Sequence, residues 1–110
     1  MNEELMEVSF GLIANAGEAK GLAFDAISKA KEGNFEGAKN LIKKSREEMH
    51  KAHEFQTKLI TKEASGEKVE MNVLLVHAQD HLMNAMNFQQ LADEFISLYE
   101  RIEKIEKNFK

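Results

Sequence analysis

Apolar residues recur every three or four positions along almost the whole chain, which is the pattern of amphipathic helices. Two polar breaks that contain glycine interrupt this pattern, one at Gly33 and one at Gly66. Gly33 suits a left-handed helix end, and Asn34 suits the N-cap of the next helix. No proline breaks the segments between them. The pattern therefore predicts three helices, at about residues 3–32, 35–64 and 69–107.

These helices would be about 45 to 58 Å long at 1.5 Å per residue. Short connections place consecutive helices antiparallel, so the prediction is an all-α, up-down-up bundle in which residues 1–110 form a single domain.

The first predicted helix carries two apolar seams side by side. One seam is mostly large: Met6, Phe10, Ile13, Gly17, Phe24 and Ile27. The other is mostly small: Leu12, Ala16, Ala19, Ala23, Ala26 and Ala30. Glycine costs a helix about 1 kcal/mol, so Gly17 and Gly21 are expected where a neighbouring backbone approaches closely. The second helix has one apolar stripe between charged faces: Phe35, Ala38, Ile42, Met49, Ala52, Phe55 and Leu59.

The third predicted helix is apolar in more than one direction. Its heptad seam comprises Met71, Leu74, Ala78, His81, Ala85, Phe88, Ala92, Phe95, Tyr99 and Ile102. Further apolar side chains point elsewhere in its first half: Val73, Leu75, Val76, Leu82, Met83 and Met86. Two partner helices cannot cover such a helix on all sides. The pattern therefore predicts a homo-oligomer with the start of this helix innermost.

Composition narrows the class of protein. The 110 residues are 43% hydrophobic and 31% charged, with no apolar run of the roughly 18 residues that a membrane span needs. The absence of cysteine excludes disulfides, thiolate metal sites and a cysteine nucleophile. A net charge of −4 provides no general attraction for nucleic acid. The start lacks the basic region of a secretory signal, so we expect a soluble, cytoplasmic protein.

One histidine cluster lies in the second predicted helix, within residues 47–54. Glu47 and His50 have the Glu-x-x-His spacing of di-iron bundles, which requires a second copy that the sequence lacks. Because the neighbours are charged, we interpret His50 and His53 as structural or solvent-exposed residues.

A second cluster interrupts an apolar stretch of the third helix. His77, Asp80 and His81 stand at i, i+3 and i+4, so they lie on adjoining parts of one face. Three interpretations are open from these residues. They form satisfied core histidines with an aspartate partner, or a zinc hydrolase site of the His-x-x-Asp-His kind that uses His77 and His81. In the third interpretation His77 is a nucleophile that carries a phosphoryl group.

Three segments carry a family resemblance: residues 11–20 (GLIANAGEAK), 52–60 (AHEFQTKLI) and 74–83 (LLVHAQDHLM). On these, the chain resembles the IIA component of the lactose/cellobiose (N,N′-diacetylchitobiose) class of the bacterial sugar phosphotransferase system. The resemblance covers nearly the whole chain. It implies three antiparallel helices per subunit and a homotrimer that forms a nine-helix bundle.

The resemblance also implies roles for individual residues. His77 would accept the phosphoryl group from the histidine phosphocarrier protein HPr and pass it to a cysteine of the cognate IIB component. Asp80 would hold one Mg²⁺ per trimer together with its two symmetry copies. Gln79 is a candidate hydrogen-bond donor to the phosphoryl group, and His81 a candidate orienting residue. The alternatives are a non-catalytic helical interaction module and the metal-dependent hydrolase, and the disaccharide stays unassigned among lactose, cellobiose and chitobiose.

Overall fold

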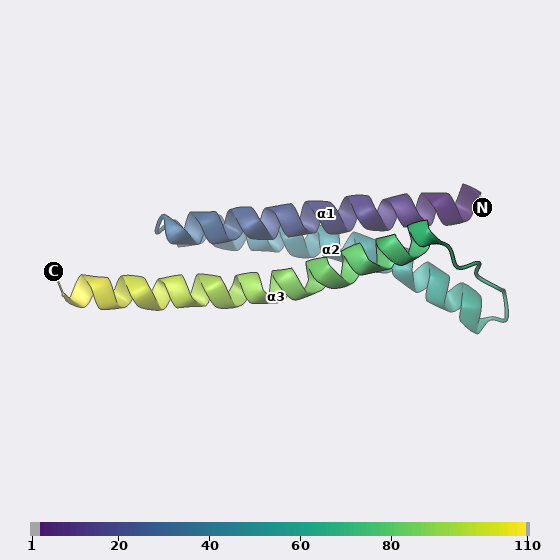
Figure 1. Cartoon of the computed structure of the whole chain (residues 1–110). Coiled ribbons are helices and arrows are strands. Elements are labelled where there is room, and N and C mark those ends of the chain that lie inside the picture. The colour runs from purple at the N-terminus through teal and green to yellow at the C-terminus, as the bar shows by residue number, and fades with distance from the viewer. Residues whose placement is uncertain (1–2, 110) are drawn as a thin grey trace.

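The computed structural model describes residues 3–109, which form three long helices. They are α1 (Glu3–Lys31), α2 (Phe35–Ala64) and α3 (Val73–Asn108). The helices run up, down and up in a rod that measures 63 × 20 × 20 Å (Figure 1). No strand occurs in the described part of the chain. The predicted all-α bundle is confirmed. Among the same residues, no helix is both long enough and apolar enough to cross a membrane.

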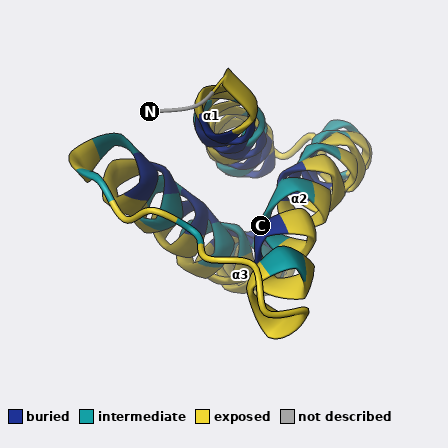
Figure 2. Ribbon diagram, turned by 90° about the vertical axis from the view of Figure 1, so that its right-hand side faces the viewer, coloured by how far each residue is buried: buried dark blue, intermediate teal, exposed yellow. Residues whose placement is uncertain are grey.

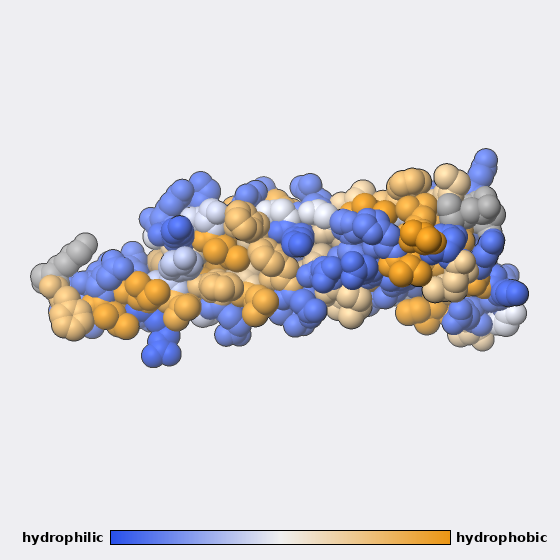
Figure 3. Space-filling view, in the orientation of Figure 1, coloured by the Kyte–Doolittle hydropathy of each residue, from blue (hydrophilic) through white to orange (hydrophobic). Residues whose placement is uncertain are grey.

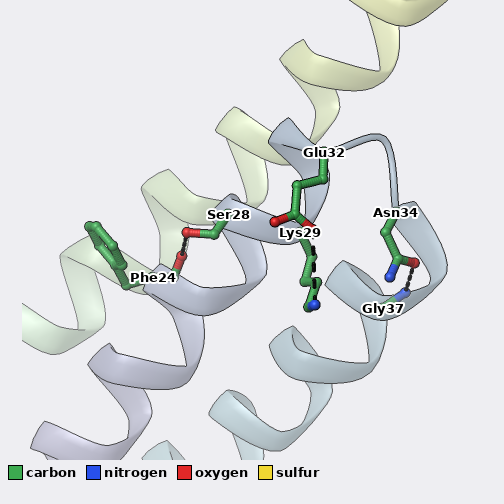
Figure 4. A network of polar contacts seen from close by, with 6 residues as sticks. All are labelled: Phe24, Ser28, Lys29, Glu32, Asn34 and Gly37. Atoms are coloured by element: carbon green, nitrogen blue, oxygen red, sulfur yellow. Dashed lines mark hydrogen bonds and ion pairs between the residues drawn. The ribbon is translucent and has the colours of Figure 1, made fainter.

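The turn between α1 and α2 forms as the sequence predicts. Gly33 has a φ of +87°, and its N–H donates to the carbonyl of Ala30 at 3.0 Å. The N–H of Asn34 donates to the carbonyl of Lys29 at 2.9 Å, which completes a Schellman motif. The Asn34 side chain then caps α2 by accepting the N–H of Gly37 at 2.9 Å (Figure 4). A left-handed glycine and a capping asparagine thus reverse the chain within three residues.

The second connection is longer than predicted. Helix α3 begins at Val73, four residues after the expected start. Asn72 lies in extended backbone, and its side-chain oxygen accepts the N–H of Leu75 at 2.9 Å, so Asn72 is the N-cap. Val69 precedes the helix and packs against the core of the bundle instead. The apolar character of Val69 therefore reflects a contact of the connection with the bundle.

Helix α1 is the central element of the bundle. It packs along both other helices, whereas α2 and α3 touch each other much less. Its small-residue seam faces inward, and Leu12, Ala16 and Ala19 are fully buried. Figure 2 shows the buried faces of the helices turned toward one another. In the large-residue seam, Phe10 and Phe24 are more than half exposed, whereas Ile13 and Ile27 are partly buried against the core.

The prediction that a neighbouring backbone approaches closely at Gly17 and Gly21 is wrong for the helices of the same chain. Both are exposed, and a methyl group at either position would meet nothing within 4 Å. Within α1, the close contact is at Gly11, where a methyl group would lie 2.6–2.8 Å from atoms of the Phe55 ring. The small-residue seam needs no glycine because alanine already lets the helices approach.

A buried polar link joins all three helices near their middle. The Ser45 hydroxyl of α2 is fully buried and donates to the carbonyl of Ala19 in α1 at 2.6 Å. The Gln89 amide of α3 donates to the Ser45 oxygen at 2.7 Å. These bonds fix the axial register of the three helices, because a shift of one helix by one residue would break them.

The outward face of α3 exposes an apolar row that we call the outer stripe. Each of its apolar members is 51–86% exposed: Val73, Val76, Met83, Leu91, Leu98 and Ile105. The end of α3 extends past the turn between α1 and α2 (Figure 1), and apolar side chains gather there (Figure 3). The prediction that this helix is apolar on several sides is confirmed, and the chain alone leaves one of those sides open.

Candidate functional site

His77 lies on the surface of α3, in the second turn of the helix. Its neighbours Leu75, Ala78 and Leu82 are buried and fix the rotation of α3 against α1 and α2. With that face held inward, position 77 is directed outward. Within residues 3–109, no hydrogen bond or ion pair engages the His77 ring. The imidazole is therefore accessible to another molecule.

His81 contacts His77 one helical turn along. The ring centroids lie 4.7 Å apart and the ring planes meet at 76°, an edge-to-face arrangement. His81 is half-buried, so it is held more firmly than His77. The contact restricts the orientations of the exposed ring.

The structure separates the other two candidates from this pair. Gln79 lies about 200° around the helix from His77, at about 100° per residue. It faces α2, where its side-chain oxygen accepts a hydrogen bond from the Gln56 amide at 3.0 Å. Asp80 is exposed on the outer stripe, between Val76 and Met83. It forms no hydrogen bond or ion pair in the described chain.

The interpretation as core histidines paired with an aspartate is thus wrong. His77 and Asp80 are both exposed, and Asp80 contacts neither ring through a hydrogen bond. In residues 3–109, no group of three or more His, Cys, Asp or Glu side chains could hold a metal ion. The described part of one chain therefore does not form a three-ligand metal site by itself.

The α1 side of α3 continues the surface around His77. Phe88, seven residues after His81, stacks on Phe24 of α1 with ring centroids 6.2 Å apart. The Lys20 ammonium lies 5.7 Å from the Phe88 ring centre. Because α1 and α3 run parallel, the same seven-residue step places Gly17 level with His81. An aromatic and small-residue surface therefore borders the histidine pair.

The histidines of α2 are exposed, as expected. His50 approaches the carboxylate of Glu54 at 3.3 Å, and His53 points to solvent. Lys51 donates to Glu48 at 3.0 Å, and this hydrogen bond raises the pKa of the lysine. This face is a solvated row of charges.

Gln56 also neighbours the site, although the sequence alone assigned no role to this residue. It lies at the edge of the apolar stripe of α2, beside Ala52 and Phe55. A half-buried polar residue at such an edge is a signal that it bonds to a neighbouring helix.

Comparisons with known proteins agree with this architecture. The family model described as "PTS system, Lactose/Cellobiose specific IIA subunit" matches residues 7–100. The chain is 49% identical over 102 residues to the lichenan-specific phosphotransferase enzyme IIA component of Bacillus subtilis, which covers 93% of each chain.

Two solved structures are also similar. The cellobiose-specific enzyme IIA from Bacillus anthracis superimposes with a TM-score of 0.91 at 46% identity, over 94% of this chain and 95% of that one. The IIA(chitobiose) of the Escherichia coli IIA–HPr complex gives a TM-score of 0.80 at 44% identity, over 93% and 99%.

Proposed function

Because the chain belongs to the lactose/cellobiose-specific IIA family of the phosphotransferase system, we propose that His77 is the residue that carries the phosphoryl group. The protein is a IIA phosphotransferase component, and its partners are HPr and the IIB component. The observation that carries the proposal is the exposed His77 ring, which has no bonded partner in residues 3–109 and rests edge-on against His81.

The chemistry consists of two displacements. A nitrogen of neutral His77 attacks the phosphorus of phosphohistidine on HPr, and the new N–P bond replaces the donor's N–P bond. The HPr imidazole leaves and takes up a proton. The thiolate of the IIB cysteine then attacks the same phosphorus, forming an S–P bond and releasing His77. Both steps need alignment more than bond activation, and His81 supports this by limiting rotation of the His77 ring.

Two partners must visit His77 in turn, so each docking must be brief. An interface near or below about 1,200 Å² suits such encounters. The exposed Phe10 and Phe24 on α1, which packs along α3, offer apolar contact area for this purpose.

We propose that three copies assemble into the nine-helix trimer through the outer stripe. Its exposed apolar side chains follow one another at steps of three, seven or eight residues, which keep them on one face of the helix. Three stripes turned toward one axis would remove these side chains from water.

Asp80 fits a metal ion in that trimer. It is an exposed carboxylate between the apolar side chains of Val76 and Met83, and three copies near one axis would repel one another. Carboxylate oxygens are suitable ligands for Mg²⁺, which would neutralise the three charges as one ion per trimer. This ion would supply structural charge compensation. We place the protein in the cytoplasm, and we assign no sugar, because the named relatives differ in their sugars.

Phosphate transfer tests the assignment of His77. With phosphoenolpyruvate, enzyme I and HPr, wild type should acquire an acid-labile, base-stable phosphate, and His77→Ala should acquire none. His50→Ala and His53→Ala, which alter exposed histidines of α2, are the matched controls and should label normally. Labelling of His77→Ala would refute the assignment. An interaction module would stay unlabelled in every form, and a hydrolase would show one zinc per chain and lose activity with a chelator.

A further inference from the structure

The first turn of α3, residues 73–76, is held only weakly by its own residues. Val73 and Val76 are β-branched, which lowers their helix propensity. Their side chains are 86% and 53% exposed, so the packing of these two side chains within the chain adds little. The turn contains no acidic residue to complement the helix dipole, whereas α1 and α2 each carry glutamate in their first turn. The start of α3 therefore depends on the residues that precede it.

Asn72 supplies this support through two hydrogen bonds. Its side-chain oxygen accepts the N–H of Leu75 at 2.9 Å, and its backbone carbonyl accepts the N–H of Val76 at 3.1 Å. Val69, three residues earlier, packs against the core and so anchors the connection that carries Asn72. The two bonded N–H groups belong to the residues directly before His77. Asn72 therefore closes the turn from which His77 emerges.

The position of the His77 ring depends on this turn. In a regular helix the N–H of His77 bonds to the carbonyl of Val73, so opening of the first turn frees the backbone of His77. The edge-to-face contact with His81, at 4.7 Å between ring centroids, requires that the two residues stand one helical turn apart. Residues 69–100 contain neither lysine nor arginine, so this segment offers no permanent positive charge to hold a phosphorylated ring in place.

We infer that Asn72 is a positioning residue for the phosphoryl transfer. By closing the first turn of α3, it keeps the His77 ring edge-on against His81, in the orientation that HPr and the IIB component meet. Asn72 acts through the backbone of α3 rather than by contact with the phosphoryl group. This inference rests on the proposed function of His77.

Assembly into the proposed trimer does not replace the cap. Val73 and Val76 belong to the outer stripe, so contacts at the axis would act on their side chains. Side-chain packing supplies no acceptor for a backbone N–H. The N–H groups of Leu75 and Val76 therefore rely on Asn72 in the trimer as well, and the experiment uses the assembled protein.

Asn34 provides a matched control because it caps α2 with the same pair of bonds. Its side-chain oxygen accepts the N–H of Gly37 at 2.9 Å, and its carbonyl accepts the N–H of Ala38 at 3.0 Å. The turn beside Asn34 lies next to Glu103 of α3. At 1.5 Å per residue, Glu103 is about 40 Å along the helix from His77. Loss of this cap should therefore lower stability without reaching the site.

Alanine substitution removes each cap in turn. In Asn72→Ala, opening of the first turn should become about fivefold more frequent, the equivalent of the roughly 1 kcal/mol that an N-cap contributes. Hydrogen exchange of the Val76 and His77 amides measures this opening. The maximal rate of transfer from HPr should fall by about 2- to 5-fold, the upper value being the full effect of the lost cap. The HPr concentration that gives half the maximal rate should stay unchanged, because docking uses other side chains.

Two further variants separate positioning from a general loss of stability. Asn72→Ser retains a capping oxygen, so its transfer rate and its amide exchange should return close to those of wild type. Asn34→Ala should lower the melting temperature about as much as Asn72→Ala and should transfer at the rate of wild type.

Three results would overturn the inference. They are unchanged transfer or unchanged exchange in Asn72→Ala, equal slowing in Asn34→Ala, and failure of Asn72→Ser to restore the rate. An unlabelled wild type would instead refute the proposed function of His77.

Discussion

Two glycines of α1 provide a stringent test of the packing. Gly11→Ala would place a methyl group 2.6–2.8 Å from the Phe55 ring, whereas Gly17→Ala would place one in open space. Both changes gain about 1 kcal/mol of helix propensity. Only Gly11→Ala also incurs the cost of overpacking, about 1–3 kcal/mol. The difference in the free energy of unfolding between the two variants therefore isolates the contact with Phe55.

Thermal unfolding followed by circular dichroism at one protein concentration measures this difference. In a domain of this size, 1 kcal/mol shifts Tm by about 4–8 °C. Gly17→Ala should melt above wild type, and Gly11→Ala should melt well below Gly17→Ala. Adding Phe55→Leu to Gly11→Ala should recover part of the loss, because the ring atoms in the clash are removed. Equal melting temperatures for the two alanine variants would refute the packing of α1 against α2. A destabilised Gly17→Ala would mean that another chain approaches α1 there.

Three further predictions concern assembly and the core. Asp80→Leu should keep the trimer in the absence of metal and abolish any dependence of its stability on Mg²⁺, measured by melting with and without chelator; collapse of the trimer would disprove carboxylate repulsion. Sedimentation of wild type should report a trimer at micromolar concentration, and Leu98→Glu on the outer stripe should shift it toward monomer; a monomeric wild type would contradict the assembly. Ser45→Ala should lower the free energy of unfolding by about 1–2 kcal/mol, and Ser45→Ala/Gln89→Leu should recover much of this, because an unsatisfied donor costs more than an absent one.

The helices and the first turn could be predicted because local chemistry determines them. Gly33 and Asn34 act through their own backbone and side chains, so their neighbours in sequence suffice. The start of α3 could not be placed, because Val69 is apolar for contacts that form only in the folded bundle. For α1, the sequence showed a seam of mostly large residues and a seam of mostly small ones. Which of the two is buried depends on how closely the neighbouring helices approach, and alanine allows a close approach.

The same distinction applies to the site. The spacing of His77, Asp80 and His81 predicted a shared region of one helix, and the structure brings the two rings together. The separation of Gln79 follows from its helical phase alone. Its bond to Gln56 could not be predicted, because the two residues are 23 positions apart and meet only when α2 and α3 pack.

The lack of lysine and arginine from Val69 to Glu100 has a consequence for how readily the group leaves again. A permanent positive charge beside His77 would stabilise the phosphorylated histidine and slow the transfer of the phosphoryl group to the IIB cysteine. Neutral donors would hold the group in place while keeping the phosphorylated and unphosphorylated states close in free energy. A phosphocarrier transfers its group in both steps most readily when the phosphoryl group has a similar free energy on the donor, on the carrier and on the acceptor. We therefore expect Asn84→Lys, which adds a positive charge two turns from His77, to load readily and unload slowly.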